Sequence, residues 1–347
     1  MTHSHSDLAR QVKAFCAEIG ADPLLVQGAG GNVSWKENGA LWIKASGTWL
    51  ADAQSKDIFV PVDLAHLRTA IDAQDFNVKP AVLGGSELRP SIETLLHALL
   101  PHRVVVHVHA IEVLAHLVQR HAQETLQRLV GEAVEWVFVD YFKPGADLAR
   151  AVSEQVSQRP RAQVVFLGSH GVVIGADDTE QVASILGLLI ERLQASPMAL
   201  STTAAPLPRA TELLTQGYVP SSDEALNELA RRADMAAILR NAWALYPDHV
   251  VFLGAAPAIL EADFTPDDLA ATAARKPAFI FAINDGVYEH SSATLAQRCQ
   301  LRCYYDVVAR LATAGELATL SERQVAELLN WDAEKYRQNV PVAKRTC

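Results

Sequence analysis

Residues 89–110, RPSIETLLHALLPHRVVVHVHA, are the most informative segment for the fold class, because they pass from a predicted helix through a proline into a predicted buried strand. Residues 90–93 (PSIE) resemble a helix N-terminus, and the leucines that follow supply an apolar stripe. Pro101 then stops the helix, and the run from Arg103 to His109 has the apolar, β-branched composition of a buried strand. A helix leading directly into a buried strand predicts a mixed α/β domain.

The sequence on either side of this stretch predicts further helices and strands. Residues 7–20 have the apolar spacing of an amphipathic helix, with Gly20 placed to end it. Residues 32–46 (NVSWKENGALWIKAS) alternate around Asn38-Gly39, a strong hairpin signal. Further strands are predicted at VEWVFVDYF and QVVFLGSHGVVIG, and a long helix at residues 179–196.

The chain of 347 residues is long enough for two domains. Residues 196–211 are rich in Pro, Ser, Thr and Ala, the composition of a linker. We therefore predict a first domain over residues 1–200, a linker over 201–211 and a smaller C-terminal α/β domain over 212–347. Within the last, HVVFLGAA (249–256) and KPAFIFAI (276–283) are predicted as strands.

Composition and charge limit the kinds of partner that the protein is expected to bind. A net charge of -10 and a pI near 5.6 argue against unspecific binding to nucleic acid or to an anionic membrane. The start MTHSHSDLAR lacks the apolar region of a signal peptide, and no apolar run is long enough to span a bilayer. We expect a cytoplasmic protein that acts on a small molecule.

Three histidines and one glutamate are candidates for a metal site. His107 and His109 are two apart in a predicted strand, so both imidazoles can point to one side. His170 follows another strand and precedes Gly171, which permits close approach of backbone to a site. Glu93 begins the helix that leads into the His107 strand. Each residue alone also fits an ordinary core, turn or helix-end role. Together, three imidazoles would leave a bound zinc ion with an open position, as in catalytic sites.

Three short segments are candidates for binding an anion. The stretch QGAGGNVS, residues 27–34, has three glycines that can expose backbone N–H groups. It matches no dinucleotide or P-loop motif. Lys44-Ala-Ser-Gly47 adds a hydroxyl and a flexible glycine, and Ser91 is expected at a helix N-terminus. Each segment alone also fits a turn or a cap.

These motifs, GAGGNVS, KASG, the SIE helix start, HVHA and SHG, resemble the class II aldolase/adducin family over residues 8–195. Within it, LWIKASG, residues 89–110 and the late LLNWDAEKYRQ (328–338) are most similar to the aldolase half of bifunctional rhamnulose-1-phosphate aldolase/dehydrogenase proteins. The resemblance implies a three-layer α/β/α sandwich around a mainly antiparallel central sheet. It also implies a homo-oligomer, most often a tetramer.

The resemblance also implies roles for single residues. His107, His109 and His170 would ligate Zn2+ or another divalent first-row metal, and Glu93 would be the catalytic acid/base. A phosphate would be bound by residues of the three anion-binding segments: Gly31, which supports the turn, with Asn32, Ser46, Gly47 and Ser91. A catalytic tyrosine is also implied, for which Tyr141 is only a candidate.

Two departures from the family bear on the substrate. The interval from Glu93 to His107 is shorter than in single-domain sugar-phosphate aldolases, and Ile92 stands where those enzymes have a second serine. The implied activity is zinc-dependent aldol cleavage of a ketose phosphate through an enediolate. Two alternatives stay open: an epimerase or decarboxylase on the same scaffold, and a non-catalytic adducin-like assembly protein. Retention of all four ligand-type residues speaks against the last.

Overall fold

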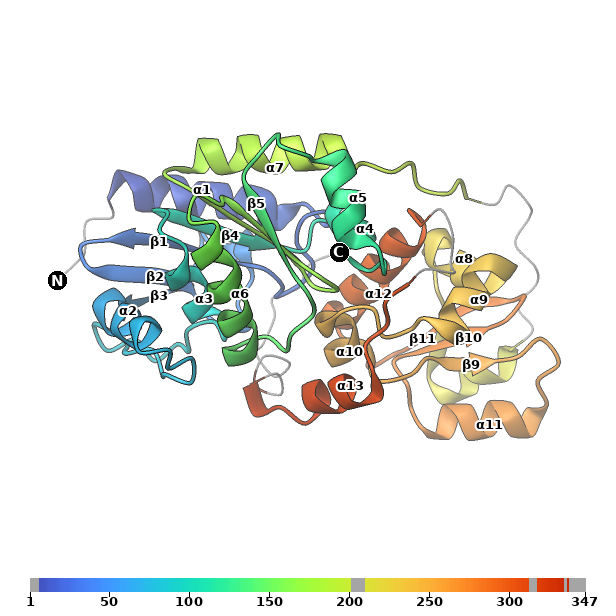
Figure 1. Ribbon diagram of the computed structural model, residues 1–347. Coiled ribbons are helices and arrows are strands. Elements are labelled where there is room, and N and C mark those ends of the chain that lie inside the picture. The colour runs from blue at the N-terminus through green and yellow to red at the C-terminus, as the bar shows by residue number, and fades with distance from the viewer. Residues whose placement is uncertain (1–5, 201–209, 312–316, 334–335, 337–347) are drawn as a thin grey trace. The chain divides into compact units, whose positions relative to one another are not determined.

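A computed structural model describes residues 6–200, 210–311, 317–333 and 336 (Figure 1). These residues form two compact units. The first contains the described parts of Met1–Gln194 and Asn330–Pro341, and the second contains the described part of Ala195–Leu329. Of the predicted linker, residues 201–209 lie outside the described residues, so the predicted domain boundaries stay a prediction.

A seven-stranded sheet with the order β3-β2-β1-β4-β7-β6-β5 forms the centre of the first unit. Every neighbouring pair is antiparallel except β5 and β6, which are parallel and are connected by a helix. The Asn38-Gly39 turn has positive φ at both residues, as a two-residue hairpin between β1 and β2 requires. The strands are β1 (Asn32–Glu37), β2 (Ala40–Lys44), β3 (Phe59–Asp63), β4 (Val104–Val108), β5 (Trp136–Val139), β6 (Val164–Leu167) and β7 (Gly171–Ala176).

Helices cover both faces of this sheet (Figure 1). Side chains of α1 and α7 pack on one face, and those of α2, α3 and α6 pack on the other. The helices of the unit are α1 (Asp7–Ala21), α2 (Leu64–Asp72), α3 (Thr94–Leu99), α4 (Ile111–Leu117), α5 (Ala122–Leu129), α6 (Ala146–Gln158) and α7 (Thr179–Leu193), with a short 3₁₀ turn at Leu50–Asp52. The expected three-layer α/β/α fold with a mainly antiparallel sheet is confirmed.

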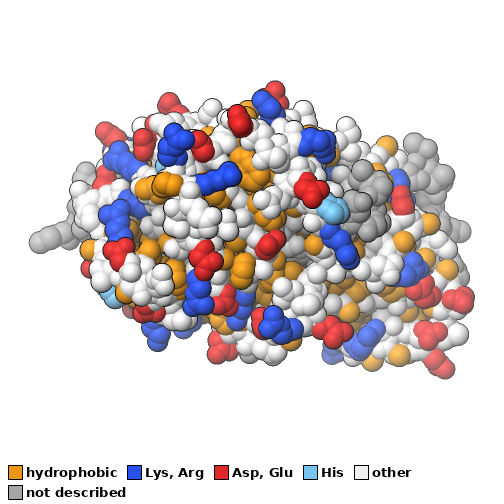
Figure 2. Space-filling model, in the orientation of Figure 1, with side chains coloured by type: hydrophobic (Ala, Val, Ile, Leu, Met, Phe, Trp, Pro, Cys, Tyr) orange, Lys and Arg blue, Asp and Glu red, His pale blue; other side chains and the backbone are white. Residues whose placement is uncertain are grey.

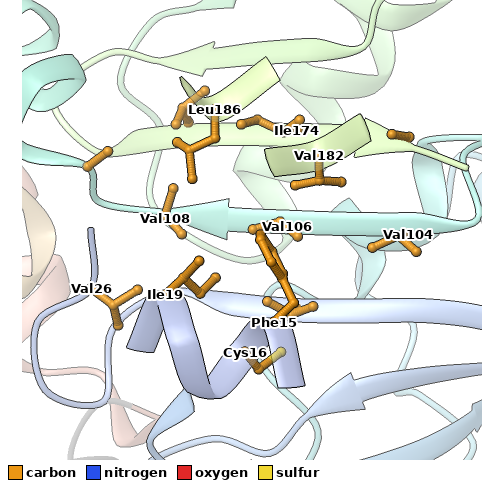
Figure 3. Close-up of a cluster of buried hydrophobic side chains, with 14 of the residues drawn as sticks. Phe15, Cys16, Ile19, Val26, Val104, Val106, Val108, Ile174, Val182 and Leu186 are labelled. Carbon is orange, nitrogen blue, oxygen red and sulfur yellow. The ribbon is translucent and has the colours of Figure 1, made fainter. Parts of the chain in front are cut away.

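Side chains of β4 point alternately to the two faces of the sheet, so they belong to two separate hydrophobic cores. Val104, Val106 and Val108 point toward α1 and α7, where they meet residues such as Phe15 and Leu186 (Figure 3). Val105 belongs to the core under α3 and α6. His107 has the same parity as Val105, so its imidazole lies on the α3 side of the sheet. The strand pattern therefore places the predicted histidine ligand His107 on the α3 side of the sheet.

Gly20 does not end the first helix, which continues to Ala21. A Cβ atom at Gly20 would lie 2.3 Å from the backbone nitrogen of Ala51. Glycine is needed here because the Leu50–Asp52 turn packs directly on the helix backbone, which the sequence pattern alone could not show.

The second unit is a smaller α/β domain with a four-stranded sheet of order β8-β11-β10-β9. The predicted strand at 249–256 is wrong: this run lies in helix α10, with Pro247 in its first turn and Gly254 just past its end. The elements are β8 (Tyr218–Pro220), β9 (Ala258–Leu260), β10 (Phe279–Ala282), β11 (Gly286–His290), a 3₁₀ turn (Thr211–Gln216), α8 (Glu224–Arg231), α9 (Ala233–Asn241), α10 (Pro247–Leu253), α11 (Pro266–Ala274), α12 (Leu295–Val308) and α13 (Glu322–Leu329).

Two surface properties bear on the expected partners. Among the described residues, no helix is both long enough and apolar enough to cross a membrane. On the face shown in Figure 2, Lys and Arg side chains are interspersed with Asp and Glu, without a continuous basic area among the described residues. The cytoplasmic location stays a prediction.

Candidate metal centre

Three buried histidines converge at one end of β4. His107 is in the strand, His109 follows it, and His170 lies in the turn between β6 and β7. The antiparallel pairing of β4 with β7 brings this turn beside the strand end. One ligand-type nitrogen of each histidine lies within 4.8 Å of the others, and the Nε2 atoms of His107 and His109 are 3.1 Å apart. The sheet thus assembles a three-imidazole cluster from two separate sequence motifs.

Backbone groups hold the His107 ring and leave little room around it. His107 Nδ1 lies 3.1 Å from the carbonyl oxygen of Val172, so a proton on Nδ1 can be donated there and Nε2 is left with its lone pair. A Cβ atom at Gly171 would lie 3.0 Å from ring atoms of both His107 and His109 and 2.7 Å from the carbonyl oxygen of Val108. Only glycine fits between these rings and the next strand.

Glu93 lies against the same cluster. Its Oε1 atom is 3.6 Å from His170 Nε2, and its Oε2 atom is 3.7 Å from His107 Nε2. Burial would raise the pKa of the Glu93 carboxyl, but His107, His170 and the amide of Asn32 outweigh it and lower the pKa to about 2. The group is therefore a carboxylate at neutral pH.

This donor set fits a divalent first-row metal. Three neutral imidazoles and one carboxylate are the ligands that such ions take in catalytic sites, where one coordination position stays open. Glu93 Oε1 is buried and has no hydrogen-bond partner among the described residues, as expected of an oxygen that serves a ligand or substrate. His107, His109 and His170 would hold the ion, with Glu93 beside it.

A buried hydrogen-bond chain orients Glu93. Asn32, directly opposite His107 in the β1–β4 ladder, donates from Nδ2 to Glu93 Oε2 at 2.7 Å. Its Oδ1 atom accepts from His97 Nε2, and His97 Nδ1 then accepts from the Ser34 hydroxyl at 2.8 Å. Burial lowers the pKa of His97 to about 3, so the ring is neutral and can donate and accept at once. His97 lies one helical turn after Glu93 in the sequence, but that spacing alone does not show this role.

Asn32 was expected to contact a phosphate. In the structure its side-chain amide contacts Glu93 and His97 instead. Its position therefore supports the Glu93 carboxylate directly, and its contact with a phosphate stays a prediction. The sequence missed this because the partner positions 93 and 97 are brought to Asn32 only by sheet pairing and helix packing.

The glycine-rich loop and the KASG segment are held together by one lysine. Lys44 is buried, and its Nζ atom donates to the carbonyl oxygens of Ala29 at 3.1 Å and Thr48 at 2.7 Å. Gly31 has a φ of +61°, and a Cβ atom there would lie 2.8 Å from the carbonyl oxygen of His107. A lysine inside the apolar run ALWIKA was the available sequence signal for this role.

Ser46 and Ser91 lie on two extended segments that pair with each other. Ala45 and Pro90 form an antiparallel bridge, with hydrogen bonds from Ser46 N to Arg89 O (2.8 Å) and from Ser91 N to Lys44 O (3.2 Å). Two predicted anion-binding serines are thus brought together, with Gly47 following Ser46 at a φ of +78°.

The helix after Ser91 begins later than expected. Helix α3 starts at Thr94 with Glu93 as its N-cap, and Ser91 Oγ accepts from Glu93 N at 3.2 Å in a turn before the helix. Ser91 therefore lies outside the helix, because its hydroxyl and carbonyl form this turn with the next residues. An anion at Ser91 would be bound by the paired segments and not by the helix end.

Tyr141 lies in the loop after β5. The backbone nitrogen of Tyr141 is 3.4 Å from the Cβ position of Gly168, two residues before His170. This places the loop beside the turn that carries a candidate ligand. Its role as a catalytic tyrosine stays a prediction.

The sequence model of the class II aldolase and adducin N-terminal domain matches residues 10–195. The chain therefore belongs to the class II aldolase/adducin family, and the resemblance that the motifs indicated is confirmed. The match covers most of the first unit, including the histidine cluster and Glu93, but not Asn330–Pro341.

Individual relatives are more distant. The uncharacterized oxidoreductase YuxG of Bacillus subtilis (strain 168) is 29% identical over 178 residues, which cover 47% of this chain and 25% of that protein. The chain thus spans about a quarter of the length of this curated relative.

Among solved structures, the N-terminal class II aldolase domain of a conserved protein from Thermoplasma acidophilum is 26% identical, covering 56% of this chain and 94% of that one, with a TM-score of 0.46. An L-fuculose 1-phosphate aldolase is 18% identical, covering 55% and 84%, with a TM-score of 0.40.

Proposed function

We propose that the protein is a zinc-dependent class II aldolase, an aldehyde-lyase that cleaves a ketose phosphate into dihydroxyacetone phosphate and a small aldehyde. The observation that carries this is the convergence of three buried imidazoles with an ionised, oriented carboxylate in a chain of this family. A divalent metal held by His107, His109 and His170 would supply Lewis-acid stabilisation of the developing enediolate charge, worth several kcal/mol.

The residues of the chain supply the proton transfer. As the bond between the α- and β-carbons of the ketose breaks, the hydroxyl on the β-carbon gives up its proton and the β-carbon becomes the aldehyde carbonyl. The electron pair stays on the α-carbon as an enediolate, which must take up one proton there. Glu93 exchanges this proton, because Asn32 fixes Oε2 at 2.7 Å while Oε1 has no hydrogen-bond partner among the described residues. The buried surroundings of Glu93 exclude water that would compete for the enediolate.

Other residues hold the substrate in place. We expect the serines at 46 and 91, with Gly47, to bind the phosphate and so to keep the carbonyl near the metal, and the backbone pairing of their two segments supports this. Lys44 fixes the two loops that carry these groups. Fixing the phosphate lowers the entropic cost of bringing the reacting carbon to Glu93.

An epimerase or decarboxylase would use the same metal and the same enediolate, so product analysis decides between these activities. The family resemblance also indicates a homo-oligomer, most simply a tetramer, which light scattering would test. The name of YuxG describes a protein of which this chain spans only a quarter, and it assigns no activity here.

The first experiment is metal analysis by mass spectrometry on tag-free protein lacking residues 1–6, which removes His3 and His5. We expect about one zinc per chain in the parent protein and its loss in His107→Ala and in His170→Ala. His66→Ala, an exposed histidine on α2, is the matched control and should keep the metal.

Cleavage of ketose phosphates is then followed by trapping the aldehyde product. Aldol cleavage that requires the metal supports the proposal. A parent protein that takes up no metal, even after zinc is added back, would falsify it and favour an adducin-like assembly protein.

A further inference from the structure

Arg89 lies in the same short ladder as the two predicted anion-binding serines. The pairing of Ala45 with Pro90 places Ser46 directly opposite Arg89, and Lys44 directly opposite Ser91. Residues directly opposite in an antiparallel pair have Cβ atoms about 4.5–5.5 Å apart on the same face, and residues two apart share that face. Arg89, Ser46 and Ser91 therefore project from one face of the ladder.

Within the described part of the chain, no salt bridge ties the guanidinium of Arg89 to the rest of the fold. Arg89 is exposed, and among the described residues it forms no ion pair with a carboxylate. The guanidinium contacts the ring of Tyr336, whose centroid lies 4.1 Å from the guanidinium carbon. A guanidinium stacked on an aromatic ring keeps its N–H groups at the edge available for an anion.

Tyr336 comes from the end of the chain, in the motif NWDAEKY that no other part of the proposed function uses. The described residues of Asn330–Pro341 belong to the first compact unit. Trp331 contacts this unit as well, with its ring 4.5 Å from Lys143 Nζ and 3.4 Å from the Cβ position of Gly145, just before α6. Two aromatic residues of the motif thus contact cationic residues of the first unit.

We propose that Arg89 binds the anionic group of the substrate, a phosphate ester or a carboxylate, and that Tyr336 positions its guanidinium. This inference rests on the proposed function and adds a specificity-determining residue to it. Ile92 removes one hydroxyl from the serine pair that sugar-phosphate aldolases carry, and a planar guanidinium supplies two donors to an oxyanion. Arg89 thus offsets the missing hydroxyl with charge-assisted hydrogen bonds.

The test is isothermal titration of the full-length, zinc-loaded protein with inorganic phosphate and, in a second arm, with acetate. Arg89→Met should weaken binding of the cognate anion about 10-fold or more, and Arg89→Lys should fall between Met and the parent protein. Arg161→Met is the matched control, because it removes the same charge from an exposed arginine before β6, at the opposite end of that strand from His170. It should bind like the parent protein.

Tyr336 is tested by a pair of variants. Tyr336→Phe keeps the ring and should bind the anion like the parent protein. Tyr336→Leu removes the ring and should weaken binding about 2- to 5-fold, the size of an exposed cation–π contact. Thermal unfolding of each variant checks that the fold is intact.

Arginine-dependent binding of phosphate assigns a phosphate ester, and arginine-dependent binding of acetate alone assigns a carboxylate. Equal binding by Arg89→Met and the parent protein, or no saturable binding of either anion by the parent protein, overturns the inference. Failure of the proposed aldolase function appears separately, as loss of metal uptake or of cleavage.

Discussion

The two units of the protein each bury histidine, but in opposite chemical settings. In the first unit, His107, His109 and His170 place ligand-type nitrogens within 4.8 Å of one another, beside the Glu93 carboxylate. In the second unit, His249 is fully buried among aromatic rings.

The rings of Trp243, Tyr304 and Tyr246 lie with centroids 4.3, 4.6 and 5.5 Å from that of His249. Neither ring nitrogen of His249 has a hydrogen-bond partner among the described residues. Burial alone therefore does not mark a candidate metal ligand. Convergence of several donors on one point does, because a metal requires multiple ligands whereas a single histidine among aromatic rings fills core volume.

The largest expected effect is that of Glu93→Gln on turnover. The amide keeps the shape of the side chain but cannot exchange a proton, so kcat should fall by about 10²- to 10⁴-fold. Metal content should stay near that of the parent protein, which separates this variant from the histidine variants. An unchanged kcat would mean that the first cluster binds metal without using Glu93 as its acid/base.

Gly171→Ala tests how tightly the histidine cluster of the first unit is packed. The new methyl group would lie 2.7 Å from the carbonyl oxygen of Val108 and 3.0 Å from the rings of His107 and His109, so the strand end that carries these ligands must shift. We expect zinc affinity to fall by about 10- to 100-fold, the size typical of a disturbed ligand support. Gly187→Ala on α7 is the control, because nothing lies within 4 Å of its Cβ position. Competition with a chelator measures both, and equal affinities would contradict the packing argument.

Asn32→Ala tests the hydrogen-bond chain that distinguishes the first cluster from His249. Loss of the 2.7 Å bond to Glu93 should lower kcat about 10-fold while zinc stays bound. Ser34→Ala, at the far end of the chain, should have a smaller effect. Equal effects of both changes would show that the chain orients Glu93 as one unit and not through Asn32 alone.

His249→Phe should have the smallest effect, and it should be a gain in stability where the other changes cause a loss of activity or of zinc affinity. Replacing a buried ring with unsatisfied nitrogens by an apolar ring should raise the free energy of unfolding by about 1 kcal/mol at neutral pH. Metal content should be unchanged. Chemical denaturation measures the gain, and destabilisation by the substitution would indicate that the nitrogens of His249 have a partner in solution.

The same variant carries a pH prediction. Burial lowers the pKa of His249 from 6.5 to about 3, so the folded state stays neutral while the unfolded state takes up a proton below pH 6.5. This histidine therefore costs stability progressively as the pH falls from 6.5 toward 3. The stability advantage of the His249→Phe variant over the parent protein should grow between about pH 7.5 and pH 5. His97 titrates in the same direction in both proteins, so only the difference between them reports on position 249.

Several features could be predicted because they depend on neighbours in sequence. The Asn38-Gly39 hairpin, the buried strand β4 with its continuous apolar run and the helix at 179–193 follow from local pattern. The strand predicted at 249–256 was wrong because a short apolar run that is buried on all sides has the same sequence pattern in a strand and in a helix. There the deciding signals were Pro247 and Gly254, which mark the two ends of the helix.

The family, the α/β class and the residues able to ligate a metal could be predicted without a structure, because they depend on residue type and short spacing. Three relations became visible only in the folded chain: Asn32 and His97 support Glu93, Gly171 has no room for a side chain, and Arg89 lies opposite Ser46. Those relations join residues far apart in the chain. Sheet register and close packing set them, and neither is encoded by the residues around any one position.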